Sequence, residues 1–312
     1  MRTLVAIGAI ANLLAFSTVA LAETAPAAPA VADVKMTSGG WAREYLVAAP
    51  QAHDKKLPVV FIFHGMGGQA KYALVDYGWA ELAQRDGFIA VAAQGLPVNP
   101  SKPSDRATNP TYWNANPTGG ARTASDPIND VQFVADILAD LEKKYPVDTT
   151  RIYATGMSNG AGMTNRLGDE MPSTFAAIAP VAGNNWGGRP VTVPLPVLMI
   201  FGRADPLVPI QGGAVKLPWG TVQQEAPLDS ANRWAKLLSC GASTNSKSGP
   251  IETFVWQGCP TGTSLKMLVV DGMGHVWPGL PTSGLPESEV GPQTKNYDAT
   301  HELWSYFQEQ HR

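Results

Sequence analysis

The pentapeptide at 156–160, Gly-Met-Ser-Asn-Gly, has the residue types of a nucleophile elbow, the G-x-S-x-G turn between a strand and a helix. A serine on such a turn has strained backbone angles, and its flanking glycines let the strand and the helix approach closely. Residues 151–155 are typical of a short buried strand and residues 159–171 of a helix. Ser158 is therefore the first candidate nucleophile, and the alternative is a solvated serine on an ordinary glycine turn.

A serine hydroxyl needs a base within hydrogen-bond reach and an acid that orients the base. Among the five histidines, His275 follows an expected strand and has glycines just before it. Asp205 follows another expected strand, and the chain order Ser158, Asp205, His275 is that of the α/β-hydrolase triad. We predict His275 as the base and Asp205 as its partner. A turn aspartate before proline and a structural histidine are the alternatives, and Asp271 is a weaker candidate for the acid.

Ester hydrolysis also needs backbone N–H groups aimed at the carbonyl oxygen that becomes negative. Asn159, the residue after the serine, supplies one such group from a helix N-terminus. The loop after residues 61–63 supplies the second, with Met66 as the candidate donor. His64 and Gly65 are expected to support this loop, and a direct catalytic role for His64 is the alternative.

Composition restricts the class of protein. The 312 residues with 44% hydrophobic content are enough for one large α/β domain. A net charge of −3 without any Lys/Arg run argues against nucleic-acid binding and favours a neutral or weakly charged substrate. No metal site is expected, because neither cysteine has a His or Cys at ligand spacing.

The N-terminus has the pattern of an export signal: Arg2, an apolar run over residues 4–16 and the cleavage site Ala20-Leu21-Ala22. We expect a signal peptide over 1–22, a flexible Ala/Pro-rich spacer over 23–39 and one catalytic domain over 40–312. The mature chain is then secreted or periplasmic. A membrane anchor is the alternative, but the apolar run is shorter than the roughly 20 residues of a spanning helix.

Apolar strand-like runs alternate with helical patterns from residue 41 onward, which is typical of a mostly parallel sheet covered by helices on both faces. Strands are expected at 58–63, 88–93, 151–155, 176–181, 196–201 and 265–270. Helices are expected at 127–144, with Asp126 as N-cap, and at 298–310. The unassigned stretches 95–125, 203–228 and 276–297 follow strand ends, where ligands bind in such sheets.

The two cysteines, Cys240 and Cys259, are most simply a disulfide in an exported chain. Two buried free thiols are the alternative. A disulfide closing a loop of this length contributes roughly 3 kcal/mol in the chain-entropy account.

Four segments form a specific combination when taken together. They are His64-Gly65 after a strand, 153–161 with the serine, 202–209 with Asp205-Pro206-Leu207-Val208-Pro209, and 274–279 with His275. Over about residues 40–310 the chain resembles the extracellular polyhydroxybutyrate depolymerase and feruloyl esterase group of α/β-hydrolases. The resemblance implies a secreted ester hydrolase without metal or cofactor that acts through an acyl-enzyme, with Ser158, His275 and Asp205 as its triad. It also implies a disulfide at the cysteine pair.

Three tryptophans are candidates for substrate binding near the expected pocket. Trp113 and Trp186 lie in polar loops suited to an acyl or aryl group, whereas packing is favoured for Trp277. The leading hypothesis is hydrolysis of hydroxyalkanoate or polyester-like esters. The alternative is a feruloyl or acetylxylan esterase, and less favoured ones are a serine peptidase or acyltransferase and a non-catalytic polymer-binding protein. The sequence predicts no oligomeric state.

Overall fold

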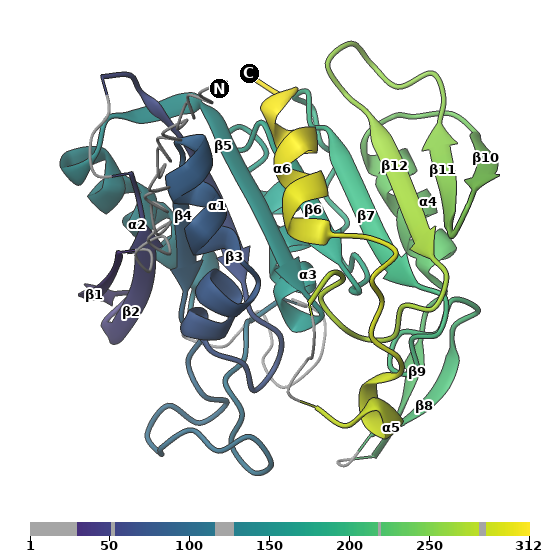
Figure 1. The fold of residues 1–312 in the computed structure, drawn as a ribbon, viewed down its shortest axis with the longest axis horizontal. Coiled ribbons are helices and arrows are strands. Elements are labelled where there is room, and N and C mark those ends of the chain that lie inside the picture. Colours follow the sequence, from purple (N-terminus) through teal and green to yellow (C-terminus); the bar gives the residue numbers. More distant parts are fainter. Residues whose placement is uncertain (1–29, 51–53, 116–127, 218–219, 281–284) are drawn as a thin grey trace, which may run out of the picture.

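The computed structural model describes residues 30–50, 54–115, 128–217, 220–280 and 285–312 (Figure 1). The predicted signal peptide, and the spacer up to residue 29, lie outside the described residues. Within them, no helix combines the length and the apolar character needed to cross a membrane.

A ten-stranded sheet forms the centre of the molecule. In spatial order its strands are β1 (Val31–Ser38), β2 (Trp41–Ala48), β4 (Ile89–Ala93), β3 (Leu57–Phe63), β5 (Val147–Met157), β6 (Ala177–Val181), β7 (Val197–Gly202), β12 (Leu265–Val270), β11 (Ile251–Trp256) and β10 (Ser243–Ser248). The six strands from β4 to β12 run parallel, and antiparallel strands extend both edges. The mostly parallel sheet predicted from the sequence is confirmed.

Helices cover both faces of this sheet, as the sequence predicts. One face carries α2 (Asp130–Lys144), α3 (Asn159–Glu170) and α4 (Pro227–Leu237), and the other carries α1 (Trp79–Asp86) and α6 (Ala299–Gln308), which stand in front of the sheet in Figure 1. Strand β3 shows why two layers form. Phe61 and Phe63 belong to one buried cluster, while Val60 and Ile62 belong to the other, because successive side chains of a strand point to opposite faces.

All six predicted strands exist, with ends shifted by a few residues. The spacer expected over 23–39 is wrong for its C-terminal part, because β1 pairs with β2 along its whole length. Its alternating side chains leave one row against the core while the polar row stays exposed, a pattern that composition alone does not reveal. The N-cap of α2 is also corrected: the side chain of Asn129 accepts a hydrogen bond from Gln132 N.

The stretches that resisted assignment contain short elements beyond the C-terminal ends of the parallel strands (Figure 1). The hairpin β8 (Gly213–Leu217) and β9 (Gly220–Gln224) follows β7, and α5 (Glu287–Val290) follows β12. These elements surround the sheet edge where we expect the site.

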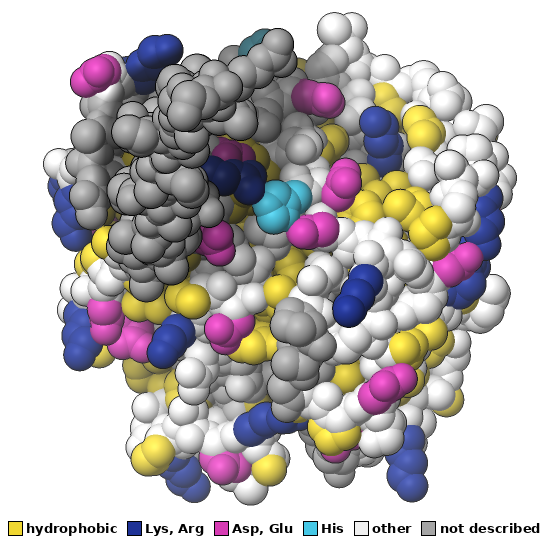
Figure 2. All heavy atoms as spheres, in the orientation of Figure 1, with side chains coloured by type: hydrophobic (Ala, Val, Ile, Leu, Met, Phe, Trp, Pro, Cys, Tyr) yellow, Lys and Arg dark blue, Asp and Glu magenta, His cyan; other side chains and the backbone are white. Residues whose placement is uncertain are grey.

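The predicted disulfide is confirmed and joins Cys240 to Cys259. It ties the end of α4 to the loop after β11. On the face drawn in Figure 2, Lys and Arg side chains lie scattered among acidic and apolar ones.

Candidate active site

Ser158 lies on the turn between β5 and α3, at the C-terminal end of the central strands. Its backbone has φ 57° and ψ −117°, a conformation that costs a non-glycine residue roughly 1–3 kcal/mol. Its amide donates to Val181 O at 2.9 Å. This strained turn matches the predicted elbow and lifts the Ser158 side chain away from the sheet.

The two glycines of the pentapeptide allow a close approach between three elements. A Cβ on Gly156 would lie 2.6 Å from Gly160 O and 2.7 Å from Phe63 O. A Cβ on Gly160 would clash with the carbonyl groups of Phe63 and His64. The end of β3 therefore packs directly against the turn, which brings the following loop beside Ser158.

His275 and Asp205 meet Ser158 from two other strand ends. His275 Nε2 lies 2.8 Å from Ser158 Oγ, and His275 Nδ1 lies 2.8 Å from Asp205 Oδ2. The second carboxylate oxygen of Asp205 accepts the backbone N–H groups of Leu207 and Val208, both at 2.8 Å. The structure thus brings the three residues chosen from the sequence into one hydrogen-bonded chain.

The burial of the acid and the base suits this arrangement. Asp205 is 4% exposed and His275 is 7% exposed, so water competes little for the hydrogen bond between them. Asp271, the weaker candidate for the acid, lies at the surface instead, where its carboxylate pairs with Arg203 and Lys247.

The loop after β3 lies against the elbow. A Cβ on Gly65 would be 3.5 Å from Ser158 Cβ, so the Gly65 backbone passes directly beside the serine. Among the described residues, the Met66 N–H finds no acceptor in the protein. The Asn159 N–H opens helix α3, where the first amides have no partner within the helix. Both candidate donors are thus available near Ser158.

His64 is fully buried behind this loop. Its Nδ1 lies 2.7 Å from Gly65 O, and its Nε2 accepts from Gly95 N at 3.0 Å. Burial lowers the pKa of His64 to about 4, so the imidazole stays neutral near neutral pH. These contacts fit the predicted role of supporting the loop, and they turn the ring nitrogens away from direct chemistry.

Two of the three candidate tryptophans, Trp113 and Trp277, are buried in the core. The prediction that Trp113 flanks a substrate group is wrong, because its ring is fully buried and its Nε1 donates to His64 O at 2.9 Å. Trp277 also packs in the core: it is 2% exposed, stacks on Tyr77 with ring centres 4.4 Å apart and donates to Thr300 Oγ1. Neither ring is available to a substrate.

Trp186 remains the one partly exposed ring of the three. It lies over Gly162, where a Cβ would be 2.5 Å from Trp186 Cζ3 and 2.9 Å from Ala115 Cβ. Gly162 is one helical turn after Ser158 and its amide bonds to Ser158 O. Trp186 therefore lies near the serine, at the base of the loop after β6.

The sequence did not reveal the polar residues that hold the loops together. Asn159 bonds through its side chain to the backbone of Trp113, and Arg43 forms a buried ion pair with Asp130. Gln94 follows β4 and contacts His64. Of these residues, only Gln94 could have been predicted from the sequence, because it is a polar residue directly after a buried strand, at the sheet edge that carries His64.

No group of three or more His, Cys, Asp or Glu side chains in the described part of the chain is arranged to hold a metal ion.

The chain matches the family described as Esterase PHB depolymerase over residues 43–218. A bifunctional acetylxylan esterase/xylanase of Neocallimastix patriciarum is 25% identical over 251 residues, which cover 78% of this chain and 32% of that protein. Feruloyl esterase B of Piromyces equi is 26% identical over 242 residues, which cover 75% of this chain and 42% of that protein. Poly(3-hydroxyalkanoate) depolymerase C of Paucimonas lemoignei is 28% identical over 134 residues, covering 43% and 30%. The chain spans less than half the length of each of these relatives.

Among solved structures, an acetyl xylan esterase from Aspergillus awamori is similar with a TM-score of 0.54. The sequences are 18% identical, and the match covers 78% of this chain and 94% of the other. At this identity the similarity shows the fold alone, and it confirms the α/β-hydrolase fold predicted from the sequence.

Proposed function

This chain belongs to the PHB depolymerase esterase family, and on that premise we propose that it hydrolyses carboxylic esters with Ser158 as nucleophile, His275 as base and Asp205 as the residue that orients the base. The observation that carries the proposal is the 2.8 Å approach of His275 Nε2 to Ser158 Oγ on a strained turn. Nucleophile, base and orienting acid within mutual hydrogen-bond reach are the requirements for serine acyl transfer.

In the first half-reaction, Ser158 Oγ attacks the ester carbonyl carbon while His275 Nε2 takes the hydroxyl proton. Asp205 accepts a hydrogen bond from the Nδ1–H group of His275, which keeps Nε2 unprotonated as the base and stabilises the imidazolium that forms. The imidazolium then gives its proton to the leaving alcohol, and an acyl-serine remains. Water attacks this ester in the same way and releases the acid.

We assign the oxyanion hole to the backbone amides of Met66 and Asn159. Donors that are fixed before the reaction stabilise the developing negative charge without reorganisation, and losing one typically costs about 10²–10³-fold in kcat. Two observations support this assignment: the Met66 N–H, next to the Gly65 backbone that passes the serine, has no acceptor among the described residues, and the Asn159 N–H is the first amide of α3.

We propose hydroxyalkanoate or polyester-like esters as the substrate class, supported by the description of the family and by the poly(3-hydroxyalkanoate) depolymerase relative. Feruloyl or acetylxylan esters are the second candidate, favoured by the names of two relatives that cover three quarters of this chain. The partly exposed ring of Trp186 near Ser158 suits an aryl or acyl group in either class.

Export from the cytoplasm is a further part of the proposal. The N-terminal sequence has the pattern of a signal peptide, and the disulfide between Cys240 and Cys259 fits an oxidising compartment. N-terminal sequencing of the mature protein should give Glu23 as the first residue. A retained Met1 in protein recovered from culture fluid or periplasm would contradict cleavage at this position.

The decisive experiment is Ser158→Ala assayed on a chromogenic ester, with the exposed Ser173→Ala as a matched control. We expect the first change to lower kcat by about 10³-fold or more, because serine and histidine act as a unit. The control should keep the parent rate, and far-ultraviolet circular dichroism should show both variants folded. A Ser158→Ala variant whose kcat lies within tenfold of the parent value would contradict the proposal. Methyl ferulate and a short hydroxybutyrate oligomer, compared with the parent enzyme, then separate the two substrate classes.

A further inference from the structure

The peptide group between Gly65 and Met66 carries the proposed oxyanion donor, the Met66 N–H, on one side. On the other side it carries the Gly65 carbonyl, which has two hydrogen-bond partners. Gly65 O lies 2.7 Å from His64 Nδ1 and 3.0 Å from Gly68 N, which donates to it. A trans peptide is planar, with its C=O and N–H pointing in opposite directions. Whatever fixes the direction of the Gly65 carbonyl therefore also fixes the direction of the Met66 N–H.

His64 can hold that carbonyl only when the proton of its neutral ring is on Nδ1, because a bare nitrogen would repel the oxygen. The surroundings of Nε2 decide this. Gly95 N is a donor by its chemistry and lies 3.0 Å from His64 Nε2, so Nε2 must accept. The proton is thereby placed on Nδ1, facing Gly65 O.

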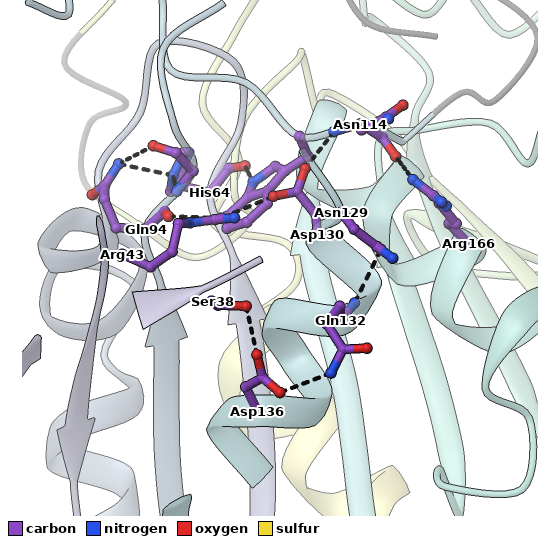
Figure 3. A network of polar contacts seen from close by, with 12 residues as sticks. Ser38, Arg43, His64, Gln94, Asn114, Asn129, Asp130, Gln132, Asp136 and Arg166 are labelled. Carbon is purple, nitrogen blue, oxygen red and sulfur yellow. Dashed lines mark hydrogen bonds and ion pairs between the residues drawn. The ribbon is translucent and has the colours of Figure 1, made fainter. Parts of the chain in front are cut away.

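The side chain of Gln94 acts in the same sense. Its Oε1 accepts from Ala70 N at 2.8 Å, which identifies the other amide atom as the nitrogen. That nitrogen lies 3.2 Å from His64 Nε2 and 3.1 Å from Gly95 O. Gln94 therefore presents a second donor to Nε2, and Figure 3 shows its amide turned toward the imidazole.

A buried ion pair is hydrogen-bonded to the backbone of Gln94 (Figure 3). Arg43 donates to Gln94 O at 3.3 Å and to Asp130 Oδ1 at 2.8 Å, while Asp130 Oδ2 accepts from Asn114 N at 2.7 Å. Both charged side chains are almost completely buried, at 1% and 0% exposure. The backbone of Gln94 is thus tied to β2, to the start of α2 and to the loop that carries Trp113.

We propose that Gln94 is a positioning residue of the active site: it holds His64 in the Nδ1–H form, and His64 in turn orients the Gly65–Met66 peptide so that the Met66 N–H faces the oxyanion. The inference rests on the proposed function, since it concerns a donor used only when the ester carbonyl becomes tetrahedral. The two donors on Nε2 share the task, so Gly95 retains part of the effect when Gln94 is changed.

The first test compares Gln94→Leu with Gln94→Glu. Leucine removes the donor and leaves Gly95 to hold the ring, so kcat should fall by ~3–10-fold with KM unchanged. Glutamate has nearly the same shape, but its carboxylate only accepts hydrogen bonds, so it favours a proton on Nε2 in competition with Gly95 N. In that tautomer Gly65 O loses the His64 donor and keeps only the hydrogen bond from Gly68 N. We expect kcat to fall by ~30–100-fold, again with KM unchanged. Gln132→Leu on the exposed face of α2 is the control.

This rank order separates positioning from packing. If Gln94 acted only by filling space, the isosteric glutamate would be the milder change and both variants would lose stability more than turnover. A Gln94→Glu variant with kcat equal to or above that of Gln94→Leu, at similar thermal midpoints, would overturn the inference.

A second pair of variants tests the same idea at His64 and does not depend on a charge at position 94. In His64→Asn the amide nitrogen takes the place of Nδ1 and keeps a donor for Gly65 O, whereas in His64→Gln the amide group takes the place of Nε2. We expect His64→Asn to retain at least tenfold more kcat than His64→Gln. Equal kcat values in these two variants would count against the tautomer.

A spectroscopic readout locates the proton directly. In protein labelled with ¹⁵N-histidine, the proton coupled to the His64 ring should be on Nδ1 in the parent and on Nε2 in Gln94→Glu, with the signal assigned by its loss in His64→Asn. A proton on Nδ1 in both would refute the role of Gln94 while leaving the ester-hydrolase assignment intact. Failure of that assignment shows separately, through an active Ser158→Ala.

Discussion

The side-chain amide of Asn159 bonds both backbone polar groups of Trp113: Trp113 N donates to Asn159 Oδ1 at 2.7 Å, and Asn159 Nδ2 donates to Trp113 O at 3.1 Å. The indole of Trp113 in turn donates to His64 O. The residue whose amide is the first proposed oxyanion donor therefore also holds, through Trp113, the loop that carries the second proposed donor.

Asn159→Ala should lower both stability and turnover. The buried Trp113 N would lose its acceptor, which costs about 1–3 kcal/mol, whereas Trp113 O keeps the hydrogen bond from Ala115 N. We expect kcat to fall about tenfold, since loosening the loop sacrifices part of an oxyanion donor worth about 10²–10³-fold. Urea unfolding and ester kinetics on the same preparation measure the two effects. Unchanged stability would show that water replaces both hydrogen bonds.

Gly160→Ala should be strongly destabilising, because the added methyl group would overlap the carbonyl groups of Phe63 and His64. Relief requires β3 and α3 to separate, and overpacking of this kind typically costs about 1–3 kcal/mol or more. Gly188→Ala is the matched control, since nothing lies within 4 Å of its Cβ position. We expect a lower urea midpoint for the first variant only; equal midpoints would contradict the close packing at the elbow.

Arg43→Met should cost about 3–5 kcal/mol of folding free energy, because it leaves the carboxylate of Asp130 buried without its charged partner. Arg85→Met breaks a surface ion pair with Asp86, in which the arginine is 58% exposed, and should cost less than about 1 kcal/mol. The comparison is made by chemical denaturation at one pH. Similar losses in the two variants would mean that the buried pair is not important for stability.

The stability of the fold should fall as the pH drops from about 6.5 to about 4 because of His64. Burial lowers the pKa of this group from 6.5 to about 4, so in this range the unfolded chain binds a proton that the folded chain does not. The contribution is complete above pH 6.5, and about 3 kcal/mol is lost by the time the folded-state pKa is reached. Urea midpoints at several pH values should show a steeper acid loss for the parent than for His64→Asn. Parallel curves would mean that folding does not lower the pKa of His64.

Trp186→Leu should change substrate preference, because this ring lies over Gly162, one turn after Ser158. We expect the ratio of kcat/KM for methyl ferulate to that for a hydroxybutyrate oligomer to change about fivefold or more, within the roughly 1–3 kcal/mol that an apolar contact contributes to discrimination. Trp277→Phe, whose ring stacks on Tyr77 in the core, should leave this ratio unaltered. An unaltered ratio in Trp186→Leu would remove this residue from the substrate pocket.

The local sequence pattern predicted strands correctly where the residues of one strand alone determine its structure. Five of the six predicted strands contain an apolar run that the sheet buries on both faces, and burial of such a run requires no knowledge of its neighbours. The sixth, β12, alternates buried residues with the exposed Lys266 and the half-buried Leu268. The edge strand β1 was missed because its exposed row is polar and it becomes a strand only by pairing with β2.

Local sequence patterns located the candidate residues along the chain: a serine between glycines, then an aspartate and a histidine after later strands, with a glycine-rich loop after an early one. Parallel strands bring their C-terminal ends to one edge of a sheet, so these residues had to converge. The direction in which each side chain points follows from the three-dimensional packing. Trp113 and Trp277 turn into the core, and Gln94, Asp130 and Asn159 find partners 30 to 87 residues away. Such pairings depend on the packing of several elements at once, and no local period records them.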